Sequence, residues 1–143
     1  MNIVLVRQGT KYPKEYVSTL IKMCEEFADK TPITITDQLD TPGDFRIMET
    51  NYTGYWSKLE LFAPWNEAIR PCLFIDLDTY LLQPIHDFLV PVNELYLIRD
   101  LGNPERSNSG VMLVPKDTSE IWQASFSWTK DRADGNFLNS QPH

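Results

Sequence analysis

The sequence has few cysteines, few basic residues and no long apolar run, and each shortage excludes a class of site, segment or partner. Its only cysteines, Cys24 and Cys72, fall within apolar patterns without metal-ligand spacing, so we expect buried free thiols in a reducing compartment. No apolar run reaches the roughly 18 residues of a membrane span. The start, MNIVLVRQGT, lacks the charged leader of a secretory signal. These absences predict a soluble cytoplasmic protein.

Basic residues are outnumbered by acidic ones. The chain has 13 Lys and Arg against 20 Asp and Glu, and a formal net charge of −7. Nucleic acids and anionic membranes attract basic surfaces, so neither is an expected partner, although a local basic pocket for one phosphate group remains compatible with this charge. The 42% of hydrophobic residues indicates a folded globule, and 143 residues suit one domain over 1–143.

Apolar residues follow strand and helix periods in turn. Short apolar runs predict strands over residues 2–6, 33–36, 45–48, 72–76, 94–99 and 110–114. Helical spacing predicts helices over 13–30 and 55–65, with Trp56, Phe62 and Trp65 in the core. A third helix should begin near residue 118, with Asp117 and Glu120 as a capping box. The opening strand–helix–strand order implies parallel strands, so we expect an α/β domain whose mostly parallel central sheet is flanked by helices.

Four acids lie at or just beyond predicted strand ends: Asp37, Asp76, Asp78 and Asp100. Open α/β sheets bind ligands at this edge, and acids gathered there repel one another unless a cation binds. Asp76 and Asp78 are two residues apart, so on a strand their side chains point to the same side. Mn²⁺ or Mg²⁺ often binds one or two carboxylates together with substrate phosphates. The pair therefore predicts such a metal site, although exposed or salt-bridged turn acids show the same spacing.

Three segments, in order, carry a resemblance to a known family. They are GYWSKLELFAP at 54–64, PCLFIDLDTYLLQPIHDFL at 71–89 and NSGVMLVP at 108–115. Together they resemble the core of the GT-A glycosyltransferases and are most similar to the glycogenin-like family 8 type. The resemblance implies a GT-A fold and a metal-dependent glycosyltransferase. Its donor would be a nucleotide sugar, by family default a uridine diphosphate sugar, and its acceptor a hydroxyl group.

The resemblance also implies a site. Asp78 would ligate the metal, Asp76 would contact the metal or the donor ribose, and Lys58 would lie near the donor phosphates. The residues that would contact the donor are Val4, Leu5, Val6, Arg7, Tyr12, Asp37, Lys58, Asp76, Asn108, Ser109 and Gly110. The turn at Arg7–Thr10 would line the nucleotide pocket, and Tyr12 would stack on the base. Gly110 would allow the backbone to approach the donor sugar closely. Surface, packing and solvated roles for Arg7, Tyr12 and Lys58, respectively, stay open.

The C-terminal segment departs from the family pattern. DGNFLN at 134–139 resembles the family's DQDILN, but Gly135 stands where the family has a glutamine beside the reacting carbon. Retaining and inverting routes therefore both stay open, and Asp100 and Asp134 are candidate bases for an inverting route. The chain also ends sooner than family members, and His143 is the candidate for their histidine metal ligand. A second copy of the chain is a candidate partner, and the acceptor is a glycan, protein or small molecule.

Two other functions fit part of the pattern. A non-catalytic or hydrolysis-only module that binds nucleotide sugars would keep the fold and the acid pair, and Gly135 favours it. A nucleotidyltransferase shares the α/β layout but would carry a glycine-rich, basic phosphate loop after the first strand. The segment RQGTKYPKE has a single glycine there, which disfavours this second alternative.

Overall fold

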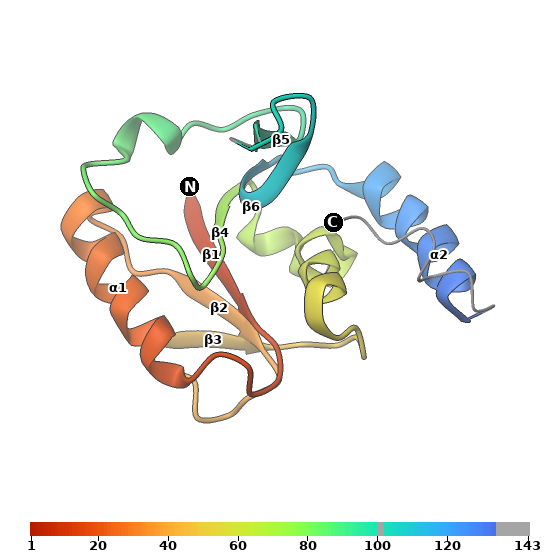
Figure 1. Cartoon of the computed structure of the whole chain (residues 1–143), viewed down its shortest axis with the longest axis horizontal. Coiled ribbons are helices and arrows are strands. Elements are labelled where there is room, and N and C mark those ends of the chain that lie inside the picture. The colour runs from red at the N-terminus through yellow and green to blue at the C-terminus, as the bar shows by residue number, and fades with distance from the viewer. Residues whose placement is uncertain (100–101, 134–143) are drawn as a thin grey trace.

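A six-stranded sheet forms the centre of this chain, for which a computed structural model describes residues 1–99 and 102–133 (Figure 1). The strands are β1 (Asn2–Arg7), β2 (Ile33–Thr36), β3 (Asp44–Ile47), β4 (Cys72–Ile75), β5 (Tyr96–Arg99) and β6 (Ser107–Val114). Their order across the sheet is β3-β2-β1-β4-β6-β5. The six predicted strands are all present, with boundaries that differ by up to three residues.

The strands and helices confirm the α/β class, and the sheet is mixed, with three parallel and two antiparallel pairings among the described strands, so the predicted mostly parallel sheet is confirmed only in part. β1 pairs in parallel with β2 and β4, and β2 pairs in parallel with β3. β6 runs antiparallel to both of its neighbours, β4 and β5. The connection from β5 to β6 is too short for the crossover that a parallel pair needs, so the chain returns antiparallel.

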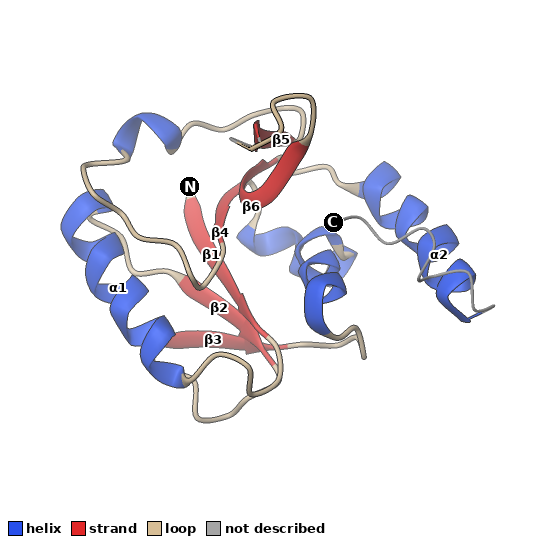
Figure 2. Cartoon of the chain, viewed as in Figure 1, coloured by secondary structure: helices blue, strands red, loops and turns tan. Residues whose placement is uncertain are grey.

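Helical segments cover both faces of the sheet (Figure 2). Helix α1 (Lys14–Ala28) packs on the face that presents Leu5 and Leu73. The opposite face presents Val4 and Phe74 to the 3-10 helices η1 (Gly54–Phe62) and η2 (Pro64–Ile69), and to the start of α2 (Ser119–Ala133). A third 3-10 helix, η3 (His86–Phe88), lies in the long connection between β4 and β5. Alternate residues of each central strand therefore enter two separate cores.

The predicted helix over 55–65 is wrong in type. The chain forms two 3-10 helices there, separated at Ala63, whose backbone is extended at φ −66° and ψ 143°. Pro64 disfavours a helical conformation in the residue before it, which explains the break. Trp56 and Phe62 are buried as predicted, but Trp65 is 41% exposed, because η2 leaves it at the edge of the core against Trp122.

The helix ends follow local hydrogen bonding. α1 ends at Ala28, and Asp29 adopts the left-handed conformation with its N–H donating to the Cys24 carbonyl. α2 begins one residue after its predicted start. Asp117 lies just outside the cap position, where its Oδ1 accepts hydrogen bonds from the N–H and hydroxyl of Ser119. The predicted partnership between Asp117 and Glu120 is therefore replaced by a turn around Ser119.

Both cysteines are buried and free, as predicted. Burial raises the pKa of the Cys24 thiol to about 11 and that of Cys72 to about 12, so both stay protonated at neutral pH. In the parts of the chain that the structure describes, no helix combines the length and apolar character needed to cross a membrane.

Candidate functional site

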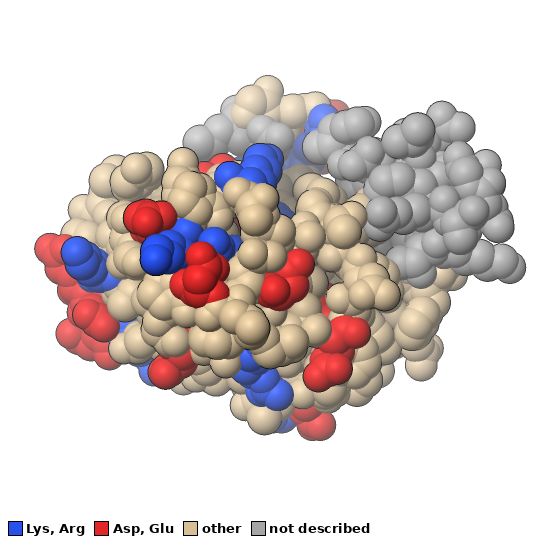
Figure 3. Space-filling view, turned by 90° about the horizontal axis from the view of Figure 1, so that it is seen from below, with Lys and Arg blue, Asp and Glu red and all other residues tan. Residues whose placement is uncertain are grey.

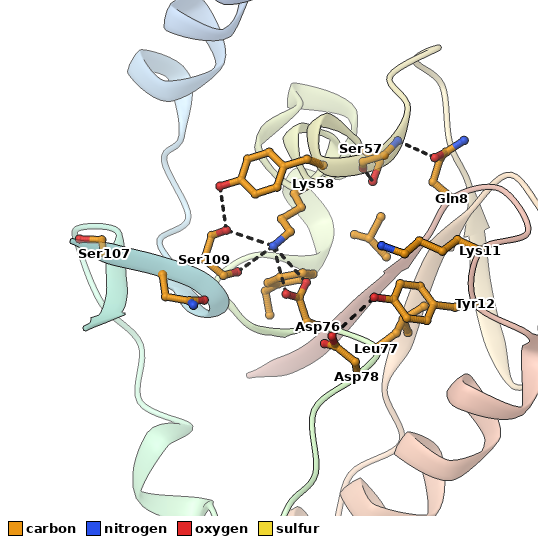
Figure 4. Close-up of a pocket in the computed structure, with 15 residues that line it drawn as sticks. Gln8, Lys11, Tyr12, Ser57, Lys58, Asp76, Leu77, Asp78, Ser107 and Ser109 are labelled. Carbon is orange, nitrogen blue, oxygen red and sulfur yellow. Dashed lines mark hydrogen bonds and ion pairs between the residues drawn. The ribbon is translucent and has the colours of Figure 1, made fainter. Parts of the chain in front are cut away.

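An open cleft of about 400 Å³ lies where β1 and β4 end and β6 begins (Figure 4). Its walls come from the turn after β1, from η1, from the end of β4 and from the start of β6. The lining residues are Val6, Gln8, Lys11, Tyr12, Gly54, Tyr55, Ser57, Lys58, Phe74, Asp76, Leu77, Asp78, Ser107, Asn108 and Ser109. The cleft is therefore at the strand edge where ligands of α/β sheets bind.

The centre of the cleft is an ion pair between Lys58 and Asp76. The Lys58 ammonium lies 3.0 Å from Asp76 Oδ1 and 3.2 Å from Oδ2. It also donates to the carbonyl and the hydroxyl of Ser109, at 3.2 and 3.0 Å. Lys58 is thus a half-buried cation with four oxygen neighbours, and the alternative of a solvated lysine is wrong.

An irregularity in β6 brings Ser109 to this ion pair. In the β5–β6 register Leu97 faces Met112, whereas Ile98 faces Asn108, so residues 109–111 have no partner on β5. Bulges of this kind redirect side chains beside functional sites. The Gly110 carbonyl accepts a hydrogen bond of 2.8 Å from the Asp76 N–H, which fixes the end of β4 against the irregular segment.

Gly110 leaves little room for a side chain in this arrangement. A Cβ at Gly110 would lie 2.9 Å from Asn108 Oδ1 and 3.3 Å from Asp76 Oδ2. Asn108 Oδ1 also accepts a 2.7 Å hydrogen bond from the Gly110 N–H. Gly110 itself does not line the cleft, and its close neighbours are side chains of the same site, so the approach to a donor that is expected at Gly110 stays a prediction.

The two carboxyl groups of the cleft have different surroundings. Burial raises the pKa of Asp76, the nearby Asp78 carboxylate raises it further, and Lys58 opposes both effects. Asp78 is exposed, and its Oδ2 lies 3.5 Å from the Tyr12 hydroxyl, a long contact. The cleft thus has one carboxyl group whose ionisation is disfavoured and one exposed carboxylate. Added positive charge would stabilise the ionised form of both.

The two carboxylates match a hard divalent ion in type but provide a minimal ligand set. Among the side chains that the structure describes, no cluster of three or more His, Cys, Asp or Glu residues is placed to hold a metal. Mg²⁺ and Mn²⁺ sites often have only one or two carboxylates and take their other ligands from water and phosphates. Asp76 and Asp78 fit that pattern. The predicted third ligand, His143, lies outside the described residues.

Arg7 was predicted to contact the donor, but it lies outside the cleft and is 4% exposed. Its Nη1 donates to Asp40 Oδ1 at 2.7 Å and to the Thr41 hydroxyl at 2.9 Å. Its Nε donates to the Tyr12 carbonyl at 3.2 Å. The hydrogen bond from Arg7 lowers the pKa of Asp40. Arg7 therefore shapes the turn that carries Tyr12, and it is neither a surface residue nor a cleft residue.

Asp37 has a similar supporting role. Its Oδ1 accepts a 2.8 Å hydrogen bond from the Gly9 N–H, and Gln38 and Gln8 donate to the same carboxylate. Partial burial alone would raise the Asp37 pKa, but these hydrogen bonds together lower it. Asp37 does not line the cleft, and it instead anchors the turn after β1.

The remaining predicted residues divide into three groups. Those that line the cleft are Val6, Tyr12, Lys58, Asp76, Asp78, Asn108 and Ser109. Val4 and Leu5 lie in the middle of β1 and are fully buried, because successive residues of a central strand face the two cores on opposite sides of the sheet. Asp100 and Asp134 lie outside the described residues.

Sequence reasoning missed Lys11, Tyr55 and Ser57 as cleft residues, whereas Gln8 belongs to the predicted turn at Arg7–Thr10 and does line the cleft. Tyr55 and Ser57 lie within the quoted GYWSKLELFAP segment, and Lys11 lies in the turn after the first strand. The rule that places ligands at strand ends could have found Lys11. The hydrogen bond that Gln8 accepts from the Gly54 N–H had no sequence signal, because it depends on the folded chain.

A comparison with models of known protein families and with curated proteins finds no match for this chain. The relationship to the GT-A glycosyltransferases therefore stays a prediction.

Replacing Lys58 by methionine should destabilise the fold at pH 7 and much less at pH 4. Folding raises the pKa of Asp76. Its contribution to stability is therefore complete below its pKa in the unfolded chain, near 4, and is lost as the pH rises through its pKa in the folded protein. Losing the ammonium raises the Asp76 pKa further and enlarges that loss to roughly 1–3 kcal/mol. This range lies below that of a fully buried pair, because the Asp76 side chain is one-third exposed.

Urea unfolding at both pH values measures this effect. The matched control is the double variant Lys58→Met/Asp76→Asn, which removes the stranded charge and should regain most of the stability lost at pH 7. A loss that is the same at both pH values would mean that Lys58 acts through packing and neutral contacts alone.

Proposed function

We propose that this protein is a metal-dependent glycosyltransferase that uses a nucleotide-sugar donor, of which a uridine diphosphate sugar is the first candidate. The observation that carries the proposal is the joining of three separate segments at one cleft. Lys58 from η1, Asp76 and Asp78 from the end of β4, and Ser109 from β6 meet there. These are the segments that carry the GT-A resemblance, and their meeting is what that resemblance requires.

The charged side chains of the cleft would suit a diphosphate that binds together with a divalent ion. Lys11 and Lys58 oppose Asp76 and Asp78, so the lining side chains have no net charge. A divalent ion would be held by Asp78 and Asp76 and would supply the charge that neutralises the diphosphate. Tyr12 offers an aromatic ring at the opposite wall from Ser109, where a base could stack.

The proposed reaction breaks the bond between the anomeric carbon and the diphosphate oxygen. A new bond forms between that carbon and the acceptor oxygen, whose proton passes to a base, and the diphosphate departs with the bonding electrons. Asp100 and Asp134 remain the candidate bases. The Lys58–Asp76 pair keeps the end of β4 and the start of β6 in fixed positions during this step.

A module that binds the donor without transferring the sugar is the alternative. The minimal metal ligand set among the described residues favours it. The two functions predict the same binding and different product release, so one series of measurements separates them.

Thermal unfolding with uridine diphosphate and with uridine diphosphate glucose, each with Mn²⁺ or with a chelator, tests the proposal. A ligand at one hundred times its dissociation constant should add about 2.7 kcal/mol of stability, and only with the metal. Release of uridine diphosphate from the sugar nucleotide then identifies an enzyme, whereas binding without release identifies the module. No stabilisation by these or by the other common nucleotide sugars would refute both.

A further inference from the structure

Two lysines reach the same cleft, but their surroundings differ. Lys58 lies deep in it, with its ammonium 5.3 Å from the centre of the Tyr55 ring and 5.2 Å from that of Phe74. Lys11 is exposed and belongs to the turn after β1. Figure 4 shows its side chain extending from that turn into the cleft. Their hydrogen bonds decide which of the two can receive a ligand.

All the hydrogen-bond donors of Lys58 are already in use. An ammonium group carries three N–H donors, and four oxygen atoms already surround that of Lys58 at 3.0 to 3.2 Å. Two belong to Asp76 and two to Ser109. To bind a phosphate, Lys58 would have to give up one of these contacts. That would leave the partly buried Asp76 carboxylate with less compensation, which is costly in a site of low dielectric.

Lys11 is the opposite case. Among the residues that the structure describes, its ammonium has no carboxylate partner within salt-bridge distance, and it lies 5.3 Å from the centre of the Tyr12 ring. A cation over an aromatic face is held in place while its N–H donors stay free for a ligand. Lys11 can therefore bind an anion without breaking any ion pair.

The turn that carries Lys11 is fixed on both sides. Before Lys11, the Gly9 N–H donates a hydrogen bond to Asp37, and the Gln8 side chain accepts a 2.7 Å hydrogen bond from the Gly54 N–H. After it, the Tyr12 carbonyl is bound by the buried Arg7. A turn that is fixed in this way loses little conformational freedom when its lysine binds a ligand.

We infer that Lys11 is the residue that binds the diphosphate of the donor, and that Lys58 is a positioning residue that acts through Asp76 and Ser109. This inference rests on the proposed function and names the side chain that recognises its leaving group. Lys11 and Asp78 then lie on the same side of the cleft as Tyr12, so one short turn provides both the phosphate contact and the aromatic ring beside it.

The effect of Lys11 must be local. Figure 3 views the molecule from below Figure 1, the side at which β1 ends, and shows acidic and basic side chains intermixed on that face. With a formal net charge of −7, the chain as a whole does not attract anions. Lys14 is three residues away and is also exposed, but it does not line the cleft, so Lys14→Met removes the same charge nearby and is a matched control for Lys11→Met.

Calorimetric titration tests this assignment with three probes: uridine, uridine diphosphate with Mn²⁺, and inorganic diphosphate with Mg²⁺. Lys11→Met should weaken binding of both diphosphates at least tenfold and leave uridine binding unchanged. Lys11→Arg should retain most of the affinity, and Lys14→Met should match the parent protein. Lys58→Met should lose stability at neutral pH in addition to any change in affinity.

Several results would overturn the inference. Equal losses in Lys11→Met and Lys14→Met would show a general charge effect, and unchanged diphosphate affinity in Lys11→Met would show that Lys11 makes no contact. Binding of inorganic diphosphate that depends on Lys11, without binding of any nucleotide, would keep the phosphate contact and reject the proposed function. If the parent protein binds neither diphosphate, the inference and the proposed function both fail.

Discussion

Glu60→Gln is expected to destabilise the protein by about 3–5 kcal/mol, the largest loss that a single isosteric change should cause here. The Glu60 side chain has no exposure to solvent, although it belongs to a 3-10 helix near the surface. Its carboxylate is the acceptor for four donors from two parts of the chain, the link after β3 and η2. A neutral amide of the same shape cannot accept from all of them.

The four hydrogen bonds explain the size of this effect. Glu60 Oε1 accepts from the backbone N–H groups of Glu49 and Thr50, and Oε2 accepts from Trp65 Nε1 and Asn66 Nδ2. In glutamine one oxygen becomes an NH₂ group, so two donors would face a donor. Each buried donor left without an acceptor costs roughly 1–3 kcal/mol.

Urea unfolding of Glu60→Gln and of the matched control Glu67→Gln measures the difference. Glu67 is an exposed acid of the neighbouring η2, and its replacement should change the unfolding free energy by less than about 0.5 kcal/mol. Equal unfolding midpoints for the two variants would mean that the Glu60 network contributes nothing to stability.

Glu60 also marks the limit of what the sequence predicts. The central strands were predictable because each is a short apolar run bounded by turn residues, and the position of Asp76 followed from the end of one such run. Glu60 lies inside a segment whose apolar spacing suggested an α-helix, on which an acid is normally solvated. Its burial depends on donors brought by the link after β3 and by η2, and no local pattern contains that information.

The candidate site shows the same division. The sequence predicted which residue types meet at the sheet edge, because parallel strands all end on one side. It did not predict that Arg7 and Asp37 would support a turn instead of lining the cleft, since their partners come from elsewhere in the fold. The irregular register of β6, which brings Ser109 to Lys58, also has no local signature beyond Gly110.

Asp78→Asn is expected to abolish the metal-dependent part of donor binding and to leave stability almost unchanged. Asp78 is exposed, and its single described contact is the long one to the Tyr12 hydroxyl, so the fold does not depend on its charge. In the proposed function it is the carboxylate most available to a divalent ion, because Lys58 occupies Asp76. A neutral amide is a much weaker ligand for Mn²⁺ or Mg²⁺ than a carboxylate.

Titration of uridine diphosphate with and without Mn²⁺, in Asp78→Asn and in the control Asp87→Asn, measures this prediction. Asp87 is an exposed acid of η3 that does not line the cleft, so its replacement removes the same charge from a different place. Asp78→Asn should bind uridine diphosphate equally weakly with and without the metal, whereas Asp87→Asn should keep the full difference. If Asp78→Asn also keeps that difference, the metal is held elsewhere and Asp78 is only an exposed turn acid.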